Sequence, residues 1–251
     1  MKNEWKISAA DVLYEDDVLI AVNKPVGVPS QATPDPQRDH AFAAVKRFLE
    51  KRGKNHYVGL HHRLDAQTSG VLLMTKDVRV NAAISEQFQS HTIKKYYRAI
   101  AAGLTPERQY IELDNPFDIR VPIGELPGKF QKFGPDGKHR KHALTSLTCT
   151  QVVHIGDYCM ASYTCRPHTG RTHQIRVHLS SIGMPIMGDA LYGEHFRALR
   201  VLEPTRMCLH AEKLTIAHPL TGESLSILAP APQAFDALVK QATKYARNAH
   251  R

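Results

Sequence analysis

Two neighbouring segments with alternating apolar and polar residues constrain the fold most strongly. The stretches ALTSLTCTQVVH at 143–154 and DYCMASYTCR at 157–166 both have the period of two that places alternate side chains on one face of a strand. Gly156 lies between them, and glycine is common in the turns that join paired strands. The sequence therefore predicts two strands joined near Gly156.

Further strands and helices are indicated along the rest of the chain. Strands are expected at 12–23, on both sides of an acidic turn at Asp16-Asp17, in VLLMT at 71–75, which suits a strand buried on both faces, and in IKKYYRAIAAG at 93–103. Helical spacing appears around 42–52, near 79–90, in THQIRVHLSSIG at 172–183, and in a terminal segment that places Phe235, Leu238, Val239, Ala242 and Tyr245 on one face. This mixture indicates the α+β class.

No linker, repeat or low-complexity tract divides the chain. We therefore expect one domain covering residues 1–251, built from two intimately joined subdomains. The span 114–142 is rich in proline, glycine and charge, and it predicts irregular loops or hairpins on the surface. We expect this span to be the most mobile part of the domain.

Composition narrows the class of partner. The formal charge of +9 points to a polyanion such as nucleic acid or an anionic membrane surface. The four cysteines form no CxxC pair, so reduced and mostly buried thiols are expected. The sequence shows neither an apolar signal core nor a membrane-spanning stretch, which predicts a soluble, cytoplasmic protein.

The densest group of chemically active residues is HRLDAQTSG at 62–70, which lies between a turn and a buried strand. Arg63 and Asp65 are two positions apart, and an isolated pair of this kind is most simply a surface ion pair of little energetic value. Loop ends of this kind also commonly carry active sites. The residues alone leave both interpretations open.

The nine-residue string as a whole resembles the HRLDxxTSG signature of the RluA-type pseudouridine synthases. It matches at every fixed position, namely His62, Arg63, Leu64, Asp65, Thr68, Ser69 and Gly70. Three more family segments follow the expected order: NKPVG at 23–27, the pattern Lys95-Tyr97-Ala99-Gly103, and GRTHQIRVHLSSIGMPIMGDALYG at 170–193. The resemblance implies a pseudouridine synthase catalytic fold, with a mixed, largely antiparallel bent sheet, flanking helices and a central RNA-binding cleft.

The resemblance also implies an isomerase that needs no cofactor or metal and acts on structured RNA. It assigns the catalytic carboxylate to Asp65, its ion-pair partner to Arg176, and the ring that stacks on the uracil to Tyr97. Without the resemblance, Arg176 would be a basic residue beside a core stripe and Tyr97 a packed strand residue. A carboxylate in a site that excludes water needs a cation nearby to stay ionised.

The remaining candidates are substrate-binding residues. Arg63 suits base flipping because its planar cation stacks on bases and pairs with phosphates. Ile175 is expected in the apolar wall, and His62 and Thr68 belong to the same signature. Lys24 and Lys95 are secondary candidates that contact either phosphate or the nearby loops. Basic clusters at 46–54, 94–98 and 138–142 either neutralise phosphates or form ordinary solvated faces.

Other classes of function remain open from the residues alone. The histidines form neither HExxH nor a zinc-like spacing, which argues against a catalytic metal. A nucleoside hydrolase or glycosidase would need a second carboxylate, for which Asp189 is the nominee, although a structural role suits Asp189 better. A non-catalytic RNA-binding module is the third class. Neither the choice between ribosomal and transfer RNA nor the oligomeric state can be derived, and a monomer is the default.

Overall fold

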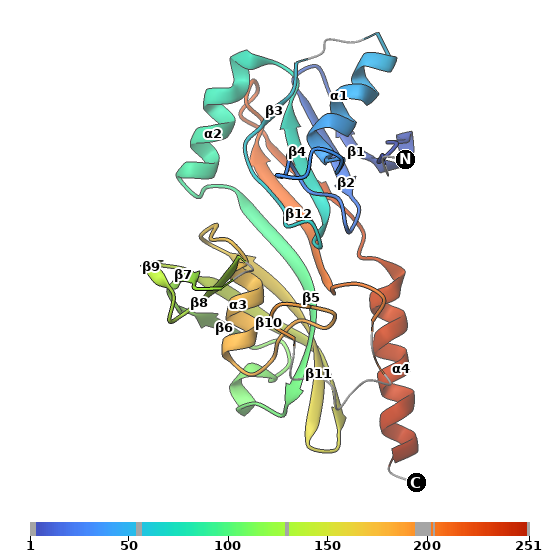
Figure 1. The fold of residues 1–251 in the computed structure, drawn as a ribbon, viewed down its shortest axis with the longest axis vertical. Helices are drawn as coiled ribbons and strands as arrows, with labels where there is room; N and C mark the ends of the chain where they lie inside the picture. The colour runs from blue at the N-terminus through green and yellow to red at the C-terminus, as the bar shows by residue number, and fades with distance from the viewer. Residues whose placement is uncertain (1–3, 54–56, 129–130, 194–201, 203, 250–251) are drawn as a thin grey trace. The chain divides into compact units, whose positions relative to one another are not determined.

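The structure, a computed structural model, describes residues 4–53, 57–128, 131–193, 202 and 204–249 (Figure 1). The chain forms two compact units. Unit 1 contains residues 1–95 and 211–230, and unit 2 contains residues 96–210 and 231–251. The chain passes between them near the start of β5 (Lys94–Leu104), near the start of β12 (Leu209–Ala217) and again between Pro230 and Ala231.

Unit 1 is a largely antiparallel sheet with helices. Its elements are the 3-10 helix η1 (Ala9–Asp11), β1 (Val12–Glu15), β2 (Leu19–Lys24), α1 (Ala41–Lys51), β3 (Gly59–Leu60), β4 (Ser69–Thr75), the 3-10 helix η2 (Val78–Val80), α2 (Asn81–Gln89), β12 and β13 (Ser224–Leu228). The strand order is β1-β2-β4-β12, with β3 on β4 and β13 on β12. The predicted pair of strands in 12–23 and the predicted helices near 42–52 and 79–90 are confirmed.

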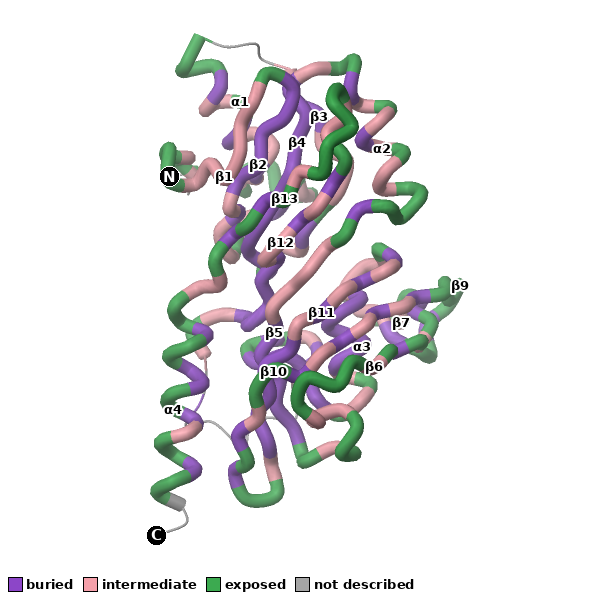
Figure 2. The backbone as a smooth tube through the Cα atoms, turned by 180° about the vertical axis from the view of Figure 1, so that it is seen from behind, coloured by how far each residue is buried: buried purple, intermediate pink, exposed green. Residues whose placement is uncertain are grey.

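The central strands of unit 1 are buried on both faces, as the apolar run VLLMT predicts (Figure 2). Alternate residues of β2 and β4, such as Leu19 and Leu73, pack with Ile84 of α2 in one core cluster. The intervening residues, such as Ile20 and Leu72, have no exposed surface either. This double burial gives the loop that precedes β4 a rigid base.

Unit 2 contains an antiparallel sheet, a small second sheet and two α-helices. Its elements are β5, the 3-10 helix η3 (Arg108–Tyr110), β6 (Pro116–Ile119), β7 (Ile123–Leu126), β8 (Lys132–Gly134), β9 (Lys138–Lys141), β10 (Thr145–Ile155), β11 (Tyr158–Pro167), α3 (Gln174–Ser181) and α4 (Gln233–Ala249). The large sheet has the order β5-β11-β10-β6. The predicted hairpin is confirmed, because β10 and β11 pair antiparallel around Gly156, which has a φ of +59°.

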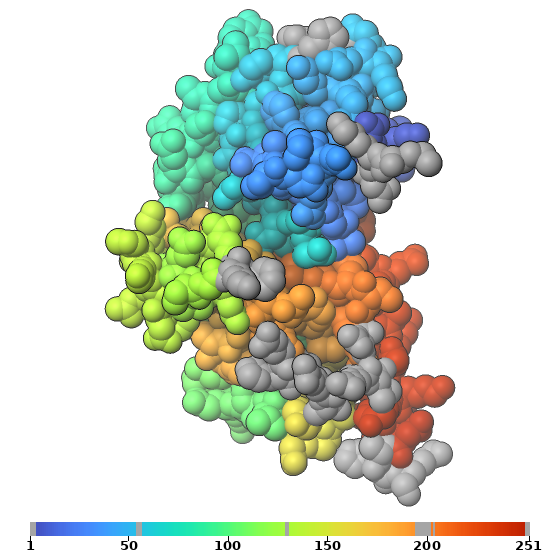
Figure 3. Space-filling model, in the orientation of Figure 1, coloured from blue at the N-terminus to red at the C-terminus, as the bar shows by residue number. Residues whose placement is uncertain are grey.

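The span 114–142 forms hairpins rather than irregular loops alone. It supplies β6 to the large sheet, while β7, β8 and β9 form a three-stranded antiparallel sheet. On the face shown in Figure 3, the residues of this small sheet gather into one yellow-green lobe. All four residues of β9, which carry the basic sequence KHRK, are exposed.

Two helices differ in burial from the sequence expectation. In α4, Phe235, Leu238, Val239 and Ala242 are buried as predicted, but Tyr245 is 39% exposed and Ala246 is buried in its place. Position 246 continues the spacing of four from Ala242, whereas 245 lies at the flank of the stripe. In α3 the apolar residues Ile175 and Leu179 are buried as expected, but burial extends to every residue from Gln174 to Leu179.

The cysteines at 149, 159, 165 and 208 are reduced and buried, as expected. Burial raises the pKa of the Cys208 thiol to about 12. Among the described residues, no helix has the length and apolar character of a membrane span.

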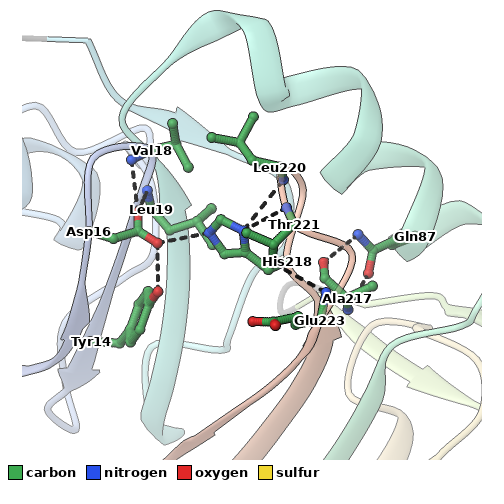
Figure 4. Close-up of polar contacts among 10 residues, drawn as sticks. All are labelled: Tyr14, Asp16, Val18, Leu19, Gln87, Ala217, His218, Leu220, Thr221 and Glu223. Carbon is green, nitrogen blue, oxygen red and sulfur yellow. Dashed lines mark hydrogen bonds and ion pairs between the residues drawn. The ribbon is translucent and has the colours of Figure 1, made fainter.

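The predicted acidic turn of unit 1 is a hydrogen-bonded hub (Figure 4). Asp16 accepts from the backbone N–H groups of Val18 and Leu19, from the Tyr14 hydroxyl at 2.6 Å and from His218 at 2.9 Å. Burial raises the pKa of Asp16, but these hydrogen bonds outweigh it and hold the pKa below its usual range. The same contact with Asp16 raises the pKa of Tyr14 to about 12. The hub ties the β1–β2 turn to the turn that follows β12.

Candidate active site

The backbone on the N-terminal side of Asp65 is fixed by a single buried hydroxyl. Ser30 Oγ accepts from the Leu64 N–H at 2.9 Å and donates to the Leu64 carbonyl oxygen at 2.8 Å. Both backbone polar groups of Leu64 are thus satisfied by one side chain that is itself buried. Asp65, half-buried, follows this clamped residue directly.

The backbone on the C-terminal side of Asp65 is fixed by the NKPVG loop. The Ala66 carbonyl oxygen accepts from the Gly27 N–H at 2.7 Å and from Lys24 Nζ at 3.2 Å. Lys24 Nζ also donates to the carbonyl oxygens of Pro25 at 3.0 Å and Val28 at 2.6 Å. One continuous segment, residues 24–30, therefore holds the backbone on both sides of Asp65.

These contacts match one of the two roles considered for Lys24. Its side chain is fully buried, with 0% exposure, and each of the three carbonyls matches one ammonium donor. A contact with phosphate would require the ammonium to leave all three partners. The structure thus favours the loop-anchoring role of Lys24, and its contact with a phosphate stays a prediction.

His62 takes part in the sheet through its side chain. Strand β3 pairs with β4 only as far as Leu60 opposite Met74. One residue before Met74 in β4, the Leu73 N–H donates to His62 Nε2 at 3.0 Å. The His62 ring also stacks on the Phe88 ring, with the ring centroids 4.7 Å apart. The imidazole thus replaces a strand carbonyl, and the main chain is released from β4 just before Asp65.

The surroundings of His62 favour the neutral form of its ring. Burial, together with the nearby charges of Lys95 and His61, lowers its pKa to about 3. Since Nε2 accepts a hydrogen bond, the neutral ring carries its hydrogen on Nδ1. His62 is therefore placed to support the loop, and its contact with the substrate stays a prediction.

The end of the signature forms a tight turn into β4. The Thr68 N–H donates to the Asp65 carbonyl oxygen at 3.0 Å, and the Thr68 side chain is buried. Gly70 has a φ of +114°, and a Cβ at this position would overlap the backbone of Ala211. Only glycine permits this close approach of β4 to β12.

The other predicted contacts of unit 1 are at the surface or near it. Arg63 is exposed, which leaves its guanidinium accessible to an RNA ligand. Lys95 is half-buried at the start of β5, and burial lowers its pKa. Of the 46–54 cluster, Lys54 lies outside the described residues, while Lys46 and Lys51 are exposed.

In unit 2, α3 is fixed by polar side chains that sequence reasoning did not single out. Gln174 Oε1 accepts from Thr169 Oγ1 at 2.7 Å and from the Arg171 N–H at 3.0 Å, while its Nε2 donates to the Leu144 carbonyl oxygen at 3.0 Å. His178 contacts Thr145 Oγ1 and the Val121 carbonyl oxygen, both at 2.9 Å. These bonds satisfy the polar atoms that the buried helix brings inside.

Arg176 forms a buried bidentate ion pair with Asp189. Arg176 Nε and Nη2 donate to the two carboxylate oxygens at 2.7 and 2.8 Å, and Asp189 is only 4% exposed. Asp189 Oδ1 also accepts from the N–H groups of Leu191 and Tyr192. The Tyr192 ring lies 5.1 Å from the guanidinium carbon, at cation–π distance. Asp189 thus holds Arg176 in one orientation, which agrees with the structural role expected for it.

Tyr97 and Ile175 both belong to the core region of unit 2. Ile175 is buried in the main cluster, and Tyr97, partly buried on β5, packs against that cluster and pairs with Cys165 of β11. Their contacts with a uracil stay predictions. The ion pair between Asp65 and Arg176 also stays a prediction, because it would join residues of different units.

The sequence interpretation missed Ser30, Tyr192, Gln174 and His178 as parts of the site's supporting structure. The sequence offers only weak indications of these roles. Ser30 lies close to the NKPVG loop, and the polar residues of α3 do not gather on one face that could be assigned to solvent. Among the described residues, no group of three or more His, Cys, Asp and Glu side chains has the arrangement of a metal site.

Comparison with known proteins identifies the family. The RNA pseudouridylate synthase family matches residues 18–181. The tRNA pseudouridine synthase C of Haemophilus ducreyi is 34% identical over 241 residues, which cover 92% of this chain and 95% of that protein. The ribosomal large subunit pseudouridine synthase D of Neisseria meningitidis serogroup A is 34% identical over 232 residues, which cover 89% of this chain and 59% of that protein.

Solved structures support the fold. Human RNA pseudouridylate synthase domain containing 4 has a TM-score of 0.71 at 21% identity, with 93% of each chain covered. Human RNA pseudouridylate synthase domain containing 1 has a TM-score of 0.67 at 24% identity, with 95% of this chain and 97% of that chain covered. The α+β pseudouridine synthase fold expected from the sequence is thereby confirmed. The chain belongs to the RNA pseudouridylate synthase family, and it is an isomerase that acts on RNA.

Proposed function

We propose that this enzyme converts specific uridines of transfer RNA or large-subunit ribosomal RNA to pseudouridine, with Asp65 as the catalytic carboxylate. The observation that carries the proposal is the anchoring of the backbone on both sides of Asp65, by Ser30 on one side and by Lys24 and Gly27 on the other. Catalysis requires a reacting group to be held in one geometry. These backbone contacts supply that geometry.

The reaction needs a carboxylate rather than a redox group. The bond between the ribose anomeric carbon and uracil N1 breaks, the base turns, and a bond forms from the anomeric carbon to uracil C5. N1 gains a proton and C5 loses one, so the product is an isomer of the substrate. The Asp65 carboxylate can stabilise or bond to the electron-poor anomeric carbon, or act as a base.

Other residues are assigned by the same family resemblance. Arg176 is proposed as the cation beside Asp65, and its bidentate contact with Asp189 supports an orienting role for the pair. Tyr97 is proposed to stack on the turned uracil, since stacking is worth about 1–3 kcal/mol per base and tolerates in-plane rotation. Arg63, which is exposed, is proposed to brace the helix from which the nucleotide is flipped.

Transfer RNA is the first candidate substrate. The relative that matches along 95% of its own length carries a transfer RNA name, and the large-subunit ribosomal enzyme matches along 59% of its length. We further propose that the enzyme works as a monomer in the cytoplasm.

The test of the substrate class is tritium release from RNA labelled at uracil C5. Wild-type enzyme is incubated with unmodified transfer RNA and large-subunit ribosomal RNA transcripts, and free uracil is measured in parallel. We expect release from one class of transcript, pseudouridine at mapped positions and no free uracil. Free uracil would identify a hydrolase instead, and release from neither transcript would overturn the proposed substrates.

A further inference from the structure

A basic groove lies in unit 2 along the terminal helix. It has a volume of about 380 Å³ and is lined by Lys240, Lys244 and Arg247 of α4, with Gln151 of β10 and Asn248 among the other lining residues. Among the described residues that line the groove, none carries a carboxylate. Every lining residue that carries a polar side chain therefore offers a hydrogen-bond donor, and the charged ones are all cations.

The three cations form one line on the solvent side of α4. They follow each other at intervals of four and three residues, which places them on the same helix face. The opposite face is occupied by Phe235, Ala242 and the other core residues. With a rise of 1.5 Å per residue, the line from 240 to 247 extends for about 10 Å.

Helix stability alone does not explain this arrangement. A cation in the last turn, such as Arg247, is favourable with the helix dipole, but Lys240 lies in the middle of the helix. Like charges four residues apart, as in Lys240 and Lys244, are unfavourable. Among the described residues, none of these three cations has an ion-pair partner. The charge remains available to an external anion.

We propose that this α4 groove binds the phosphate backbone of the substrate RNA at a position separate from the residues that carry the chemistry. The proposal rests on RNA being the substrate, and it deepens the proposed function by assigning an RNA-positioning surface. Lysine and arginine neutralise phosphates, while the amides of Gln151 and Asn248 add donors without sequence preference. The groove would therefore contribute to affinity and orientation, and the turnover step would not depend on it.

The test compares charge removal in the groove with equal charge removal elsewhere. The groove variant is Lys240→Gln/Lys244→Gln, and the control is Lys6→Gln/Arg108→Gln, in which both residues are exposed and outside the groove. The variant Lys240→Arg/Lys244→Arg keeps the charge. Dissociation constants for unmodified transfer RNA and ribosomal RNA transcripts are measured between 50 and 300 mM salt, roughly the range in which phosphate contacts weaken.

Each lost phosphate contact should lower the slope of log Kd against log salt by about 0.7–0.9, so the groove variant, which loses two, should lose about 1.4–1.8 in slope. Its KM for RNA should rise roughly tenfold with kcat unchanged, while the arginine variant and the control stay within about twofold of wild type. A groove variant with the wild-type slope and KM would overturn the proposal. Failure of the proposed function would be recognised separately. The wild-type enzyme would then release no tritium, whatever the salt dependence of RNA binding.

Discussion

The two charged residues proposed for catalysis, Asp65 in unit 1 and Arg176 in unit 2, are positioned by different kinds of contact. Around Asp65 the anchoring bonds go to main-chain groups of its neighbours Leu64 and Ala66. Around Arg176 the guanidinium itself is held, by the carboxylate of Asp189 and the ring of Tyr192. The carboxylate is thus positioned through the backbone of its loop, whereas the cation is positioned through its own charged atoms.

This difference predicts how each half responds to mutation. The backbone groups held near Asp65 are neutral N–H and carbonyl groups, so loss of the clamp leaves them unsatisfied, which costs about 1–3 kcal/mol. A buried ion pair that loses one partner leaves an uncompensated charge, which costs about 3–5 kcal/mol. Damage to unit 2 should therefore appear first in stability, and damage to the loop of unit 1 should appear in activity as well.

The largest effect on stability is expected for Asp189→Asn. The substitution keeps the shape but removes the negative charge that faces Arg176, so the free energy of unfolding should fall by about 3–5 kcal/mol. Urea denaturation followed by circular dichroism measures this change. As the control, Arg120→Gln breaks the exposed pair with Asp118 and should cost no more than about 1 kcal/mol. Equal effects of the two variants would show that burial of the Arg176 pair contributes little.

A smaller loss is expected for Lys24→Met. This change removes the ammonium that joins three carbonyl oxygens, and it should lower the free energy of unfolding by about 1–3 kcal/mol. Because Ala66 next to Asp65 loses an anchor, kcat should also fall, while KM for RNA should change little. The exposed Lys6→Met serves as control and should leave both quantities near wild type. A rise in KM with kcat intact would instead return Lys24 to the role of a phosphate ligand.

The smallest effect is expected for His62→Gln and depends on pH. The unfolded histidine binds a proton below its ordinary pKa of 6.5, whereas the folded ring does so only below about 3. The unfolded state therefore holds more protons in this window, so the free energy of unfolding decreases as the pH falls from 6.5 toward 3. Replacement by glutamine, whose oxygen can accept from the Leu73 N–H, should remove this contribution.

The measurement for His62 is the difference in unfolding free energy between wild type and His62→Gln at pH 7 and pH 5. The wild type should lose about 1–2 kcal/mol more than the variant over this interval. Other buried histidines, such as His178, remain in both proteins and cancel in the comparison. A constant difference between the two proteins would show that His62 is not held neutral by the fold.

The sequence was sufficient to predict the elements and the signature loop but not the supporting contacts. The alternation at 143–166 and the apolar run at 71–75 are local patterns, and both became the expected strands. The hydroxyl of Ser30 acts on Leu64 across 34 positions, and Asp189 reaches Arg176 across 13, so no local pattern records these bonds. The burial of α3 on all sides was equally difficult to predict. In a sequence, a polar residue with a buried hydrogen-bond partner looks the same as a polar residue that faces solvent.

The central claim is that Asp65 carries the chemistry while the surrounding backbone holds it in place. Tritium release from C5-labelled RNA by Asp65→Asn, compared with wild type in single-turnover reactions, tests this claim most directly. Asparagine keeps the size of the side chain but removes its charge, so we expect release to fall by at least about 10³-fold, with unchanged RNA affinity and thermal stability. Release by Asp65→Asn within about tenfold of wild type would contradict the assignment of Asp65 as the catalytic carboxylate.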